Sequence, residues 1–98
     1  MIKVRNITNT NGNKVPNQFE IVDTDNSTMF QSYDSIIAMV RNSDSRVYLD
    51  GYYWDYSVTT MRHLYNFLRQ WGYDLNKKKV LELIEDGVFT LTNLNKVG

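Results

Sequence analysis

The chain has 98 residues, of which 42% are hydrophobic and 22% are charged, a composition typical of one folded domain and not of a disordered chain. Eleven Lys and Arg side chains balance eleven Asp and Glu side chains, which disfavours general duplex binding because such proteins neutralise many phosphates. The absence of Cys excludes disulfides, thiolate catalysis and Cys-based metal sites. We therefore expect a single domain over residues 1–98, built around one hydrophobic core.

The amino terminus carries no apolar segment of signal-peptide length. The longest apolar run, "IIAMV" at residues 36–40, is too short to span a membrane. We expect a cytoplasmic protein without a membrane partner, in which the two N-glycosylation sequons, at Asn6 and Asn26, arise by chance.

The amino-terminal part alternates apolar with polar residues, which is the pattern of half-exposed strands. Ile2 and Val4 share one face of a first strand, as Phe19 and Ile21 share one face of a second. An Asn-Gly pair and the only Pro lie between these runs and predict a turn, because Asn and Gly tolerate positive φ. The expected hairpin has strands over residues 2–7 and 18–22 and a loop over residues 8–17.

Three more strands are predicted before the middle of the chain, separated by the turn-forming segments "DTDNS" and "RNSDS". The run "SIIAMV" is rich in β-branched residues and favours a strand, although Ser32 is also placed to cap a short helix there. The three strands are expected over residues 28–33, 35–40 and 46–49.

The apolar period changes to that of a helix after Ser57, which is a good N-cap, and Gly72 is a left-handed stop. A second helix is predicted from Asn76 to Asp86, with Gly87 as its stop. Residues 88–93 alternate again and predict a final strand or an extended tail. The expected buried stripes are Val58, Met61, Leu64, Tyr65, Leu68 and Trp71 in the first helix, and Val80, Leu81 and Ile84 in the second.

These elements predict an α+β fold, with an antiparallel β-sheet of four to six strands and two helices in the carboxy-terminal half. Catalytic chemistry has little support in the sequence. His63, the only histidine, has no sequence signal for an orienting partner and is expected to be structural or exposed. Asp23 and Asp25 lie in a loop without the twelve-residue calcium pattern. We expect no enzyme, no catalytic residue, no metal and no cofactor.

The segment "YYWDY" at residues 52–56 is the most aromatic part of the chain. If it is extended, Trp54 and Tyr56 share one face and are expected to pack under the first helix. Seven Tyr side chains are more than so small a core can bury, and Tyr is typical of protein interfaces. Base stacking is the competing use, which the neutral charge disfavours. The predicted partner anchors are Tyr52, Tyr53, Tyr73 and Arg69.

Charges in the second helix oppose its dipole. Lys77, Lys78 and Lys79 lie at its positive end, and acidic residues lie at its negative end. We predict that these lysines serve a partner, either a nucleic-acid backbone or an acidic protein patch. A tolerated exposed cluster is the alternative.

The start of the first helix is a weak candidate anion site, because a helix N-terminus presents free N–H groups. Helix capping explains the same residues without any ligand. The candidate residues are Ser57, Thr59, Thr60 and Arg62.

A pattern over residues 29–68 resembles that of small phage and prophage proteins. Its parts here are Phe30-Gln31-Ser32-Tyr33, Ile37-Ala38, Trp54-Asp55-Tyr56-Ser57, Thr59-Thr60 and Phe67-Leu68. Val58 departs from the pattern, which has a basic residue there, and this weakens the anion site. The resemblance implies a phage origin, and hence the cytoplasm of a host bacterium. Phage proteins of this kind are similar to anti-defence inhibitors, including anti-CRISPR proteins.

The leading hypothesis is a non-enzymatic phage inhibitor that binds a bacterial defence effector, foremost a CRISPR effector nuclease, by protein–protein contact. The alternative is a small phage nucleic-acid-binding or regulatory module, with a basic face made by Arg62, Arg69 and the lysine run. A self-assembling phage component is a third hypothesis. The sequence leaves the oligomeric state open.

Overall fold

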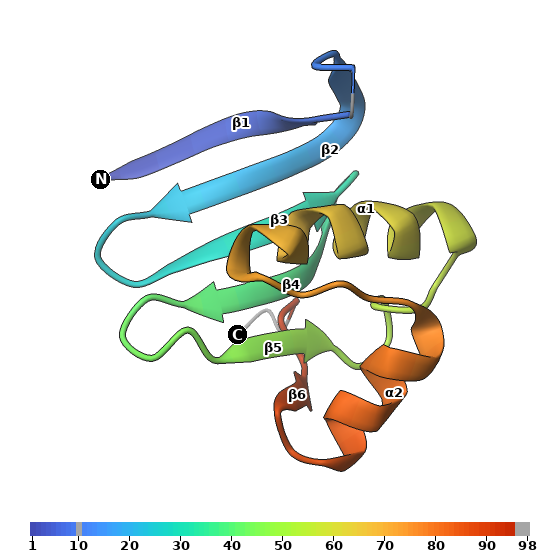
Figure 1. Cartoon of the computed structure of the whole chain (residues 1–98). Helices are drawn as coiled ribbons and strands as arrows, with labels where there is room; N and C mark the ends of the chain where they lie inside the picture. Colours follow the sequence, from blue (N-terminus) through green and yellow to red (C-terminus); the bar gives the residue numbers. More distant parts are fainter. Residues whose placement is uncertain (10, 96–98) are drawn as a thin grey trace.

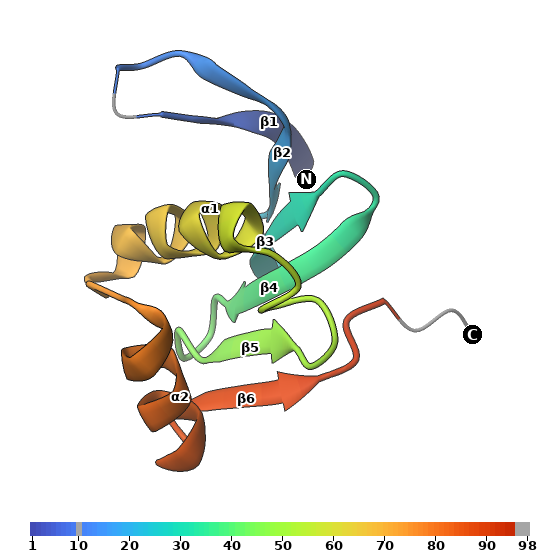
Figure 2. The same ribbon diagram turned by 90° about the vertical axis from the view of Figure 1, so that its right-hand side faces the viewer.

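A computed structural model describes residues 1–9 and 11–95. It contains a six-stranded sheet with both α-helices on one side of it, as Figure 1 and Figure 2 show. The predicted α+β class, its strands and its two helices are confirmed. The elements are β1 (Ile2–Thr8), β2 (Lys14–Asp23), β3 (Ser27–Ser32), β4 (Ser35–Arg41), β5 (Val47–Asp50), α1 (Val58–Leu68), the 3-10 helix η1 (Arg69–Trp71), α2 (Lys77–Glu85) and β6 (Phe89–Thr92).

The strands follow one another across the sheet in the order β1-β2-β3-β4-β5-β6. The first five pair in antiparallel fashion, as predicted, and they form a meander. β6 differs, because it pairs with β5 in parallel. The connection from β5 to β6 contains both helices, and such a crossover returns the chain in the same direction.

The first hairpin loop is shorter than predicted. The prediction assigned residues 8–17 to the loop, whereas β2 already begins at Lys14; residue 10 of this loop lies outside the described residues. Asn17, inside β2, has a φ of 63°, so the turn-forming tendency of Asn is used within a strand.

The core lies between the sheet and the helices. Phe30 of β3 is fully buried and stacks on Phe67 of α1, with ring centroids 5.7 Å apart. Trp54, in the segment before α1, is also buried in this core. Among the described residues, no helix is long and apolar enough to cross a membrane.

Both helices begin where predicted, and α2 ends there too. α1 ends at Leu68, and the 3-10 helix η1 continues to the predicted stop at Gly72. Each predicted stripe contains one wrong residue. Val58 and Leu81 are exposed, while Phe67 and Leu83 face the core in their place. Leu81 lies about 100° around the helix from the buried Val80, whereas Leu83 is within about 60° of it.

A buried polar bridge joins the first hairpin to α1. Glu20 of β2 is only 6% exposed, and its Oε2 accepts a hydrogen bond from Arg5 Nε of β1 at 2.8 Å. Its Oε1 accepts one from Gln70 Nε2, just beyond α1, at 2.9 Å. These groups line a hollow of about 460 Å³ between the hairpin and the helix. Because apolar side chains do not fill this hollow, hydrogen bonds hold the hairpin to the helix here.

Replacing Glu20 by Ala should lower the free energy of unfolding by about 1–3 kcal/mol, since Arg5 and Gln70 lose their shared acceptor in a partly buried place. Urea denaturation followed by Trp fluorescence measures this change. Glu85→Ala removes an exposed carboxylate and should change the free energy by less than about 0.5 kcal/mol. Equal effects of the two substitutions would show that the bridge does not stabilise the fold.

Candidate functional site

The segment between β5 and α1, residues 51–57, is named here the tyrosine loop. It consists mainly of turns, so the extended conformation considered in the sequence analysis does not occur, and the turns bring its three tyrosine rings together. The ring centroids of Tyr52 and Tyr53 are 4.7 Å apart, those of Tyr53 and Tyr56 are 5.9 Å apart, and those of Tyr52 and Tyr56 are 6.1 Å apart. Such distances are those of favourable aromatic pairs.

The exposure of these rings differs from the sequence prediction at one position. Tyr52 is 69% exposed, and Tyr53 is half-buried against the core. Tyr56 was predicted to be a core residue, and this is wrong, since it is 67% exposed. The cause is a turn in which Tyr56 N–H donates to the Tyr53 carbonyl at 3.2 Å, so the two-residue alternation of a strand does not apply.

A buried carboxylate fixes the shape of the tyrosine loop. Asp50, the last residue of β5, is 2% exposed. Its Oδ2 accepts the backbone N–H groups of Tyr52 at 3.1 Å and Tyr53 at 2.9 Å. Two N–H donors on one oxygen hold the first turn of the loop in a single conformation.

The other oxygen of Asp50 binds the segment after β6. Asp50 Oδ1 accepts the Leu94 N–H at 2.9 Å and Asn95 Nδ2 at 3.1 Å. Asn95 in turn pairs with the backbone of Ile36 in β4: its Oδ1 accepts the Ile36 N–H at 2.7 Å, and its Nδ2 donates to the Ile36 carbonyl at 2.9 Å. One carboxylate thus links the tyrosine loop, the chain after β6 and, through Asn95, β4.

The turn between β3 and β4 adds a fourth tyrosine. β3 and β5 run in the same direction in the meander, so the turn after β3 lies at the same end of the sheet as the tyrosine loop. Tyr33 in this turn is 65% exposed and has a φ of 54°, which is uncommon for a residue other than Gly. Its N–H donates to the Asn17 carbonyl at 2.7 Å, and its carbonyl accepts Gln31 Nε2 at 2.6 Å. Strained residues held in this way cluster at functional sites.

The turn and the tyrosine loop enclose a hollow of about 400 Å³. Its wall combines tyrosine rings, hydroxyl groups and one carboxylate. Tyrosine gives contact area at low entropic cost and hydroxyl groups give adaptable hydrogen bonds, a mixture typical of protein-binding surfaces. The lining residues are Ser32, Tyr33, Asp34, Ser35, Ile37, Tyr53, Tyr56, Ser57 and Thr60.

Two residues of this site, Tyr33 and Asp50, were not among the site residues predicted from the sequence. Tyr33 was predicted as the last residue of a strand over residues 28–33, whereas β3 ends at Ser32 and Tyr33 lies in the turn that follows; side chains of such turns are exposed and often bind. Asp50 begins "DG" directly after a predicted strand, where an Asp side chain commonly accepts N–H groups two or three residues on.

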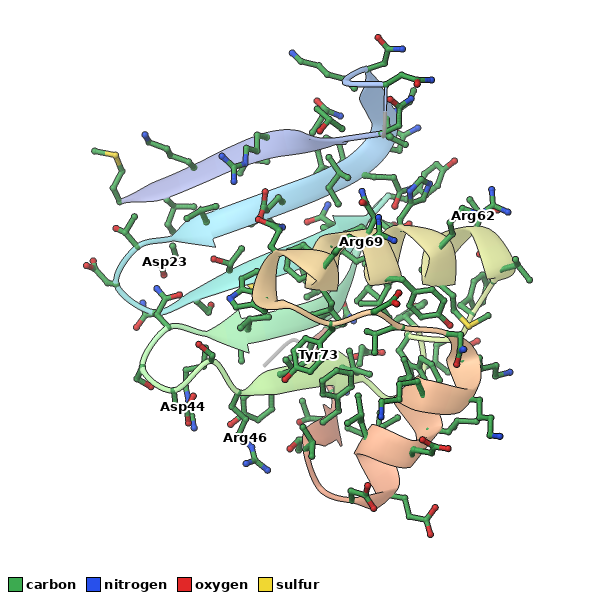
Figure 3. All side chains as sticks on the ribbon, in the orientation of Figure 1. Asp23, Asp44, Arg46, Arg62, Arg69 and Tyr73 are labelled. Carbon is green, nitrogen blue, oxygen red and sulfur yellow. The ribbon has the colours of Figure 1, made fainter. Side chains whose placement is uncertain are left out.

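The other predicted partner residues do not line this hollow. Arg62 lies on α1, Arg69 begins η1 directly after it, and Tyr73 lies in the segment that leads to α2 (Figure 3). Tyr73 is half-buried with its ring against Phe89 at 5.0 Å, so it serves the core in part. The exposed Lys77, Lys78 and Lys79 begin α2.

The candidate anion site is occupied by capping interactions. Ser57 Oγ accepts the Thr60 N–H at 3.0 Å and donates to Thr60 Oγ1 at 2.9 Å. Thr59 and Arg62 are exposed beside it. Two of the three hydroxyl groups expected to face an anion, those of Ser57 and Thr60, are therefore already hydrogen-bonded to each other.

The titratable groups considered for catalysis or metal binding have structural surroundings. Burial lowers the pKa of the half-buried His63 from its ordinary value of 6.5, and the neighbouring Arg62 lowers it further. Asp23 accepts Asn26 Nδ2 at 2.8 Å and the Asp25 N–H at 3.2 Å within a turn, and these bonds lower its pKa. Among residues 1–9 and 11–95, no three His, Asp or Glu side chains lie close enough to hold a metal ion.

Fold and site together define a small α+β protein with an ordered group of tyrosines at one end of its sheet. A model of a family of unknown function, DUF8033, matches residues 2–85, and the chain belongs to that family. The match includes β1 to α2 and thus both walls of the hollow. No curated protein and no solved structure matches the chain.

Asp50→Asn should lower the free energy of unfolding by about 2–3 kcal/mol. The amide NH₂ group replaces a carboxylate oxygen, so a hydrogen-bond donor then faces N–H groups that need an acceptor. Hydrogen exchange at the Tyr52 and Tyr53 amides should accelerate together with this loss. Asp55→Asn is the control, as Asp55 is an exposed carboxylate of the same loop. Unchanged amide exchange in Asp50→Asn would show that the carboxylate does not order the loop.

Proposed function

We propose that this protein is a non-enzymatic, phage-encoded inhibitor that binds a bacterial defence effector through its tyrosine loop. One observation carries the proposal. Tyr33, Tyr53 and Tyr56 come from two segments and line one hollow, and the Tyr52 ring contacts two of them. A surface of this kind suits recognition of another protein.

The rigidity of the site supports binding by occupancy. Tyr33, Tyr52 and Tyr56 are each about two-thirds exposed, so each has ring area that a partner can bury. The hydrogen bonds of Asp50 and the contacts of Tyr33 order these segments before any partner arrives. Binding then costs less conformational entropy than it would with a mobile loop.

The choice of a defence effector rests on the phage resemblance. Six residues of that pattern line the hollow, namely Ser32, Tyr33, Ile37, Tyr56, Ser57 and Thr60. Others, such as Phe30, Trp54 and Phe67, are in the core. The resemblance thus includes the proposed binding surface as well as the fold, and a CRISPR effector nuclease is the first partner to test.

A second candidate function is nucleic-acid binding, which one observation favours. Arg62, Arg69 and Lys77–Lys79 are exposed, and within the described part of the chain they form no ion pair. The formal net charge of zero argues against it. This function requires a shift of labelled DNA or RNA that weakens steeply with salt; no shift, or a flat salt dependence, would reject it.

The inhibitor should reduce cleavage by its target nuclease until about one protein is present per effector, since each bound copy blocks one enzyme. Replacing Tyr52 and Tyr56 together by Ala should weaken inhibition at least about thirtyfold, because exposed tyrosines are frequent binding hot spots. Cleavage assays titrated with each protein measure both effects. Val58→Ala, which shortens an exposed side chain outside the hollow, should keep full potency.

Two results would contradict the proposal. Inhibition at strongly substoichiometric amounts would indicate turnover and reject occupancy. Full potency of the double variant, with a normal melting temperature, would exclude the tyrosine loop as the binding surface.

A further inference from the structure

The face of the sheet away from the helices carries a continuous apolar row. The strand register places one residue from each of β1 to β5 side by side in this row. Figure 2 shows α1 and α2 on the opposite side of the strands, and no described helix covers this face. We name this set the open-face row: Val4, Ile21, Met29, Met39 and Tyr48.

The direction of these side chains follows from the neighbouring row. Glu20 and Phe30 precede or follow row residues by one position, and both contact the helix side, through Gln70 and Phe67. Successive side chains of a strand point to opposite faces, so the open-face row points away from α1. Val4 is accordingly 62% exposed.

The open-face row is flanked by two rows that contain both polar and apolar residues. The next register row toward the β2–β3 turn contains Ile2, Asp23, Ser27 and Arg41. The row on the other side contains Asn6, Phe19, Gln31 and Ile36. Five strands about 4.8 Å apart and three rows about 7 Å apart make a patch of roughly 500 Å² in projection. This size gives a small interface of moderate strength.

We propose that two copies of this chain associate through their open faces, about a two-fold axis that runs along β3. The pattern is symmetric about this strand. Asp23 lies one strand to one side of β3 and Arg41 lies one strand to the other side, in the same row. The two-fold axis therefore sets Asp23 opposite Arg41 of the second copy, and Arg41 opposite its Asp23.

The same axis pairs the apolar residues without opposing like charges. Ile21 meets Met39 of the second copy, Val4 meets its Tyr48, and Met29 meets its own equivalent on the axis. Methionine adapts its shape to such contacts. Sheets pack in this way about 10 Å apart with strands within about 30° of each other.

Arg41 is already positioned over the open face. Its guanidinium lies 5.5 Å from the centroid of the Tyr48 ring, and its Nε and Nη2 donate to Asp44. The remaining N–H groups are available for Asp23 of the second copy. Figure 3 shows Asp23 and Asp44 at the same end of the sheet. An unrelated partner would not require opposite charges at equal distances from β3, which is why a second copy is the occupant.

Sedimentation equilibrium over about 5–500 µM, the range suited to a small interface, should show reversible association from monomer to dimer. Met29→Glu places two carboxylates opposite each other on the axis and should weaken association at least about a hundredfold. Val58→Glu is the control, because Val58 on α1 is 69% exposed and Glu there lies outside the open face. Circular dichroism and the melting temperature establish that each variant is folded.

A chain that stays monomeric throughout this range would overturn the proposal, as would a folded Met29→Glu variant that dimerises like the control. The position of the axis has its own test, because the chain has no Cys. Met29→Cys should form a covalent dimer with a bismaleimide that spans about 10 Å, and Val58→Cys should not. Equal cross-linking of the two variants would overturn the arrangement.

Discussion

The Asp50 carboxylate makes the hydrogen bonds on which the structure of the tyrosine loop depends. It is almost fully buried and accepts four N–H groups, three of them from the backbone. A buried carboxylate is costly unless its oxygens are hydrogen-bonded, and here both are. The same bonds that make its burial tolerable also hold the tyrosine loop and the chain after β6 in place. Stability and the presentation of the tyrosines therefore have a common cause.

The topology explains why no helix in the described part of the chain covers one face of the sheet. Both helices belong to the single connection from β5 to the parallel β6, and a crossover covers only the face on which it lies. The strands before β5 are joined by short turns that cannot cover the other face. The apolar open-face row is thus a direct result of the order of elements. On the other face, where the helices cease to cover the sheet, the hydrogen bonds of Glu20 join the first hairpin to the residue just beyond α1.

Local signals allowed prediction of the elements but not of the site. Ser57, Asn76, Gly72 and Gly87 mark helix ends through chemistry that acts within four residues, and the structure confirms them. The parallel pairing of β6 depends on how two helices pack, which no short pattern contains. The exposure of Tyr56 was predicted wrongly because the two-residue alternation of a strand was applied to residues 52–56. The hydrogen bonds of Asp50 create turns in this segment. The prediction that Ile2 and Val4 lie on the same face of their strand was correct. Which face of the sheet the helices cover could not be predicted, because it depends on the long-range register of the strands.

The two proposed surfaces have a fixed geometric relation. The tyrosine loop follows the carboxyl end of β5, and Tyr33 follows that of β3, whereas the open-face row lies on the flat side of the sheet. A two-fold axis parallel to β3 leaves the direction along the strands unchanged. It therefore puts the tyrosine loops of both copies at the same end of the dimer. Two sites that point the same way can bind a two-fold symmetric partner or two neighbouring sites at once, and a modest affinity of each site then becomes a strong combined one. Small size and a single tyrosine group per chain would in that case be sufficient for tight inhibition.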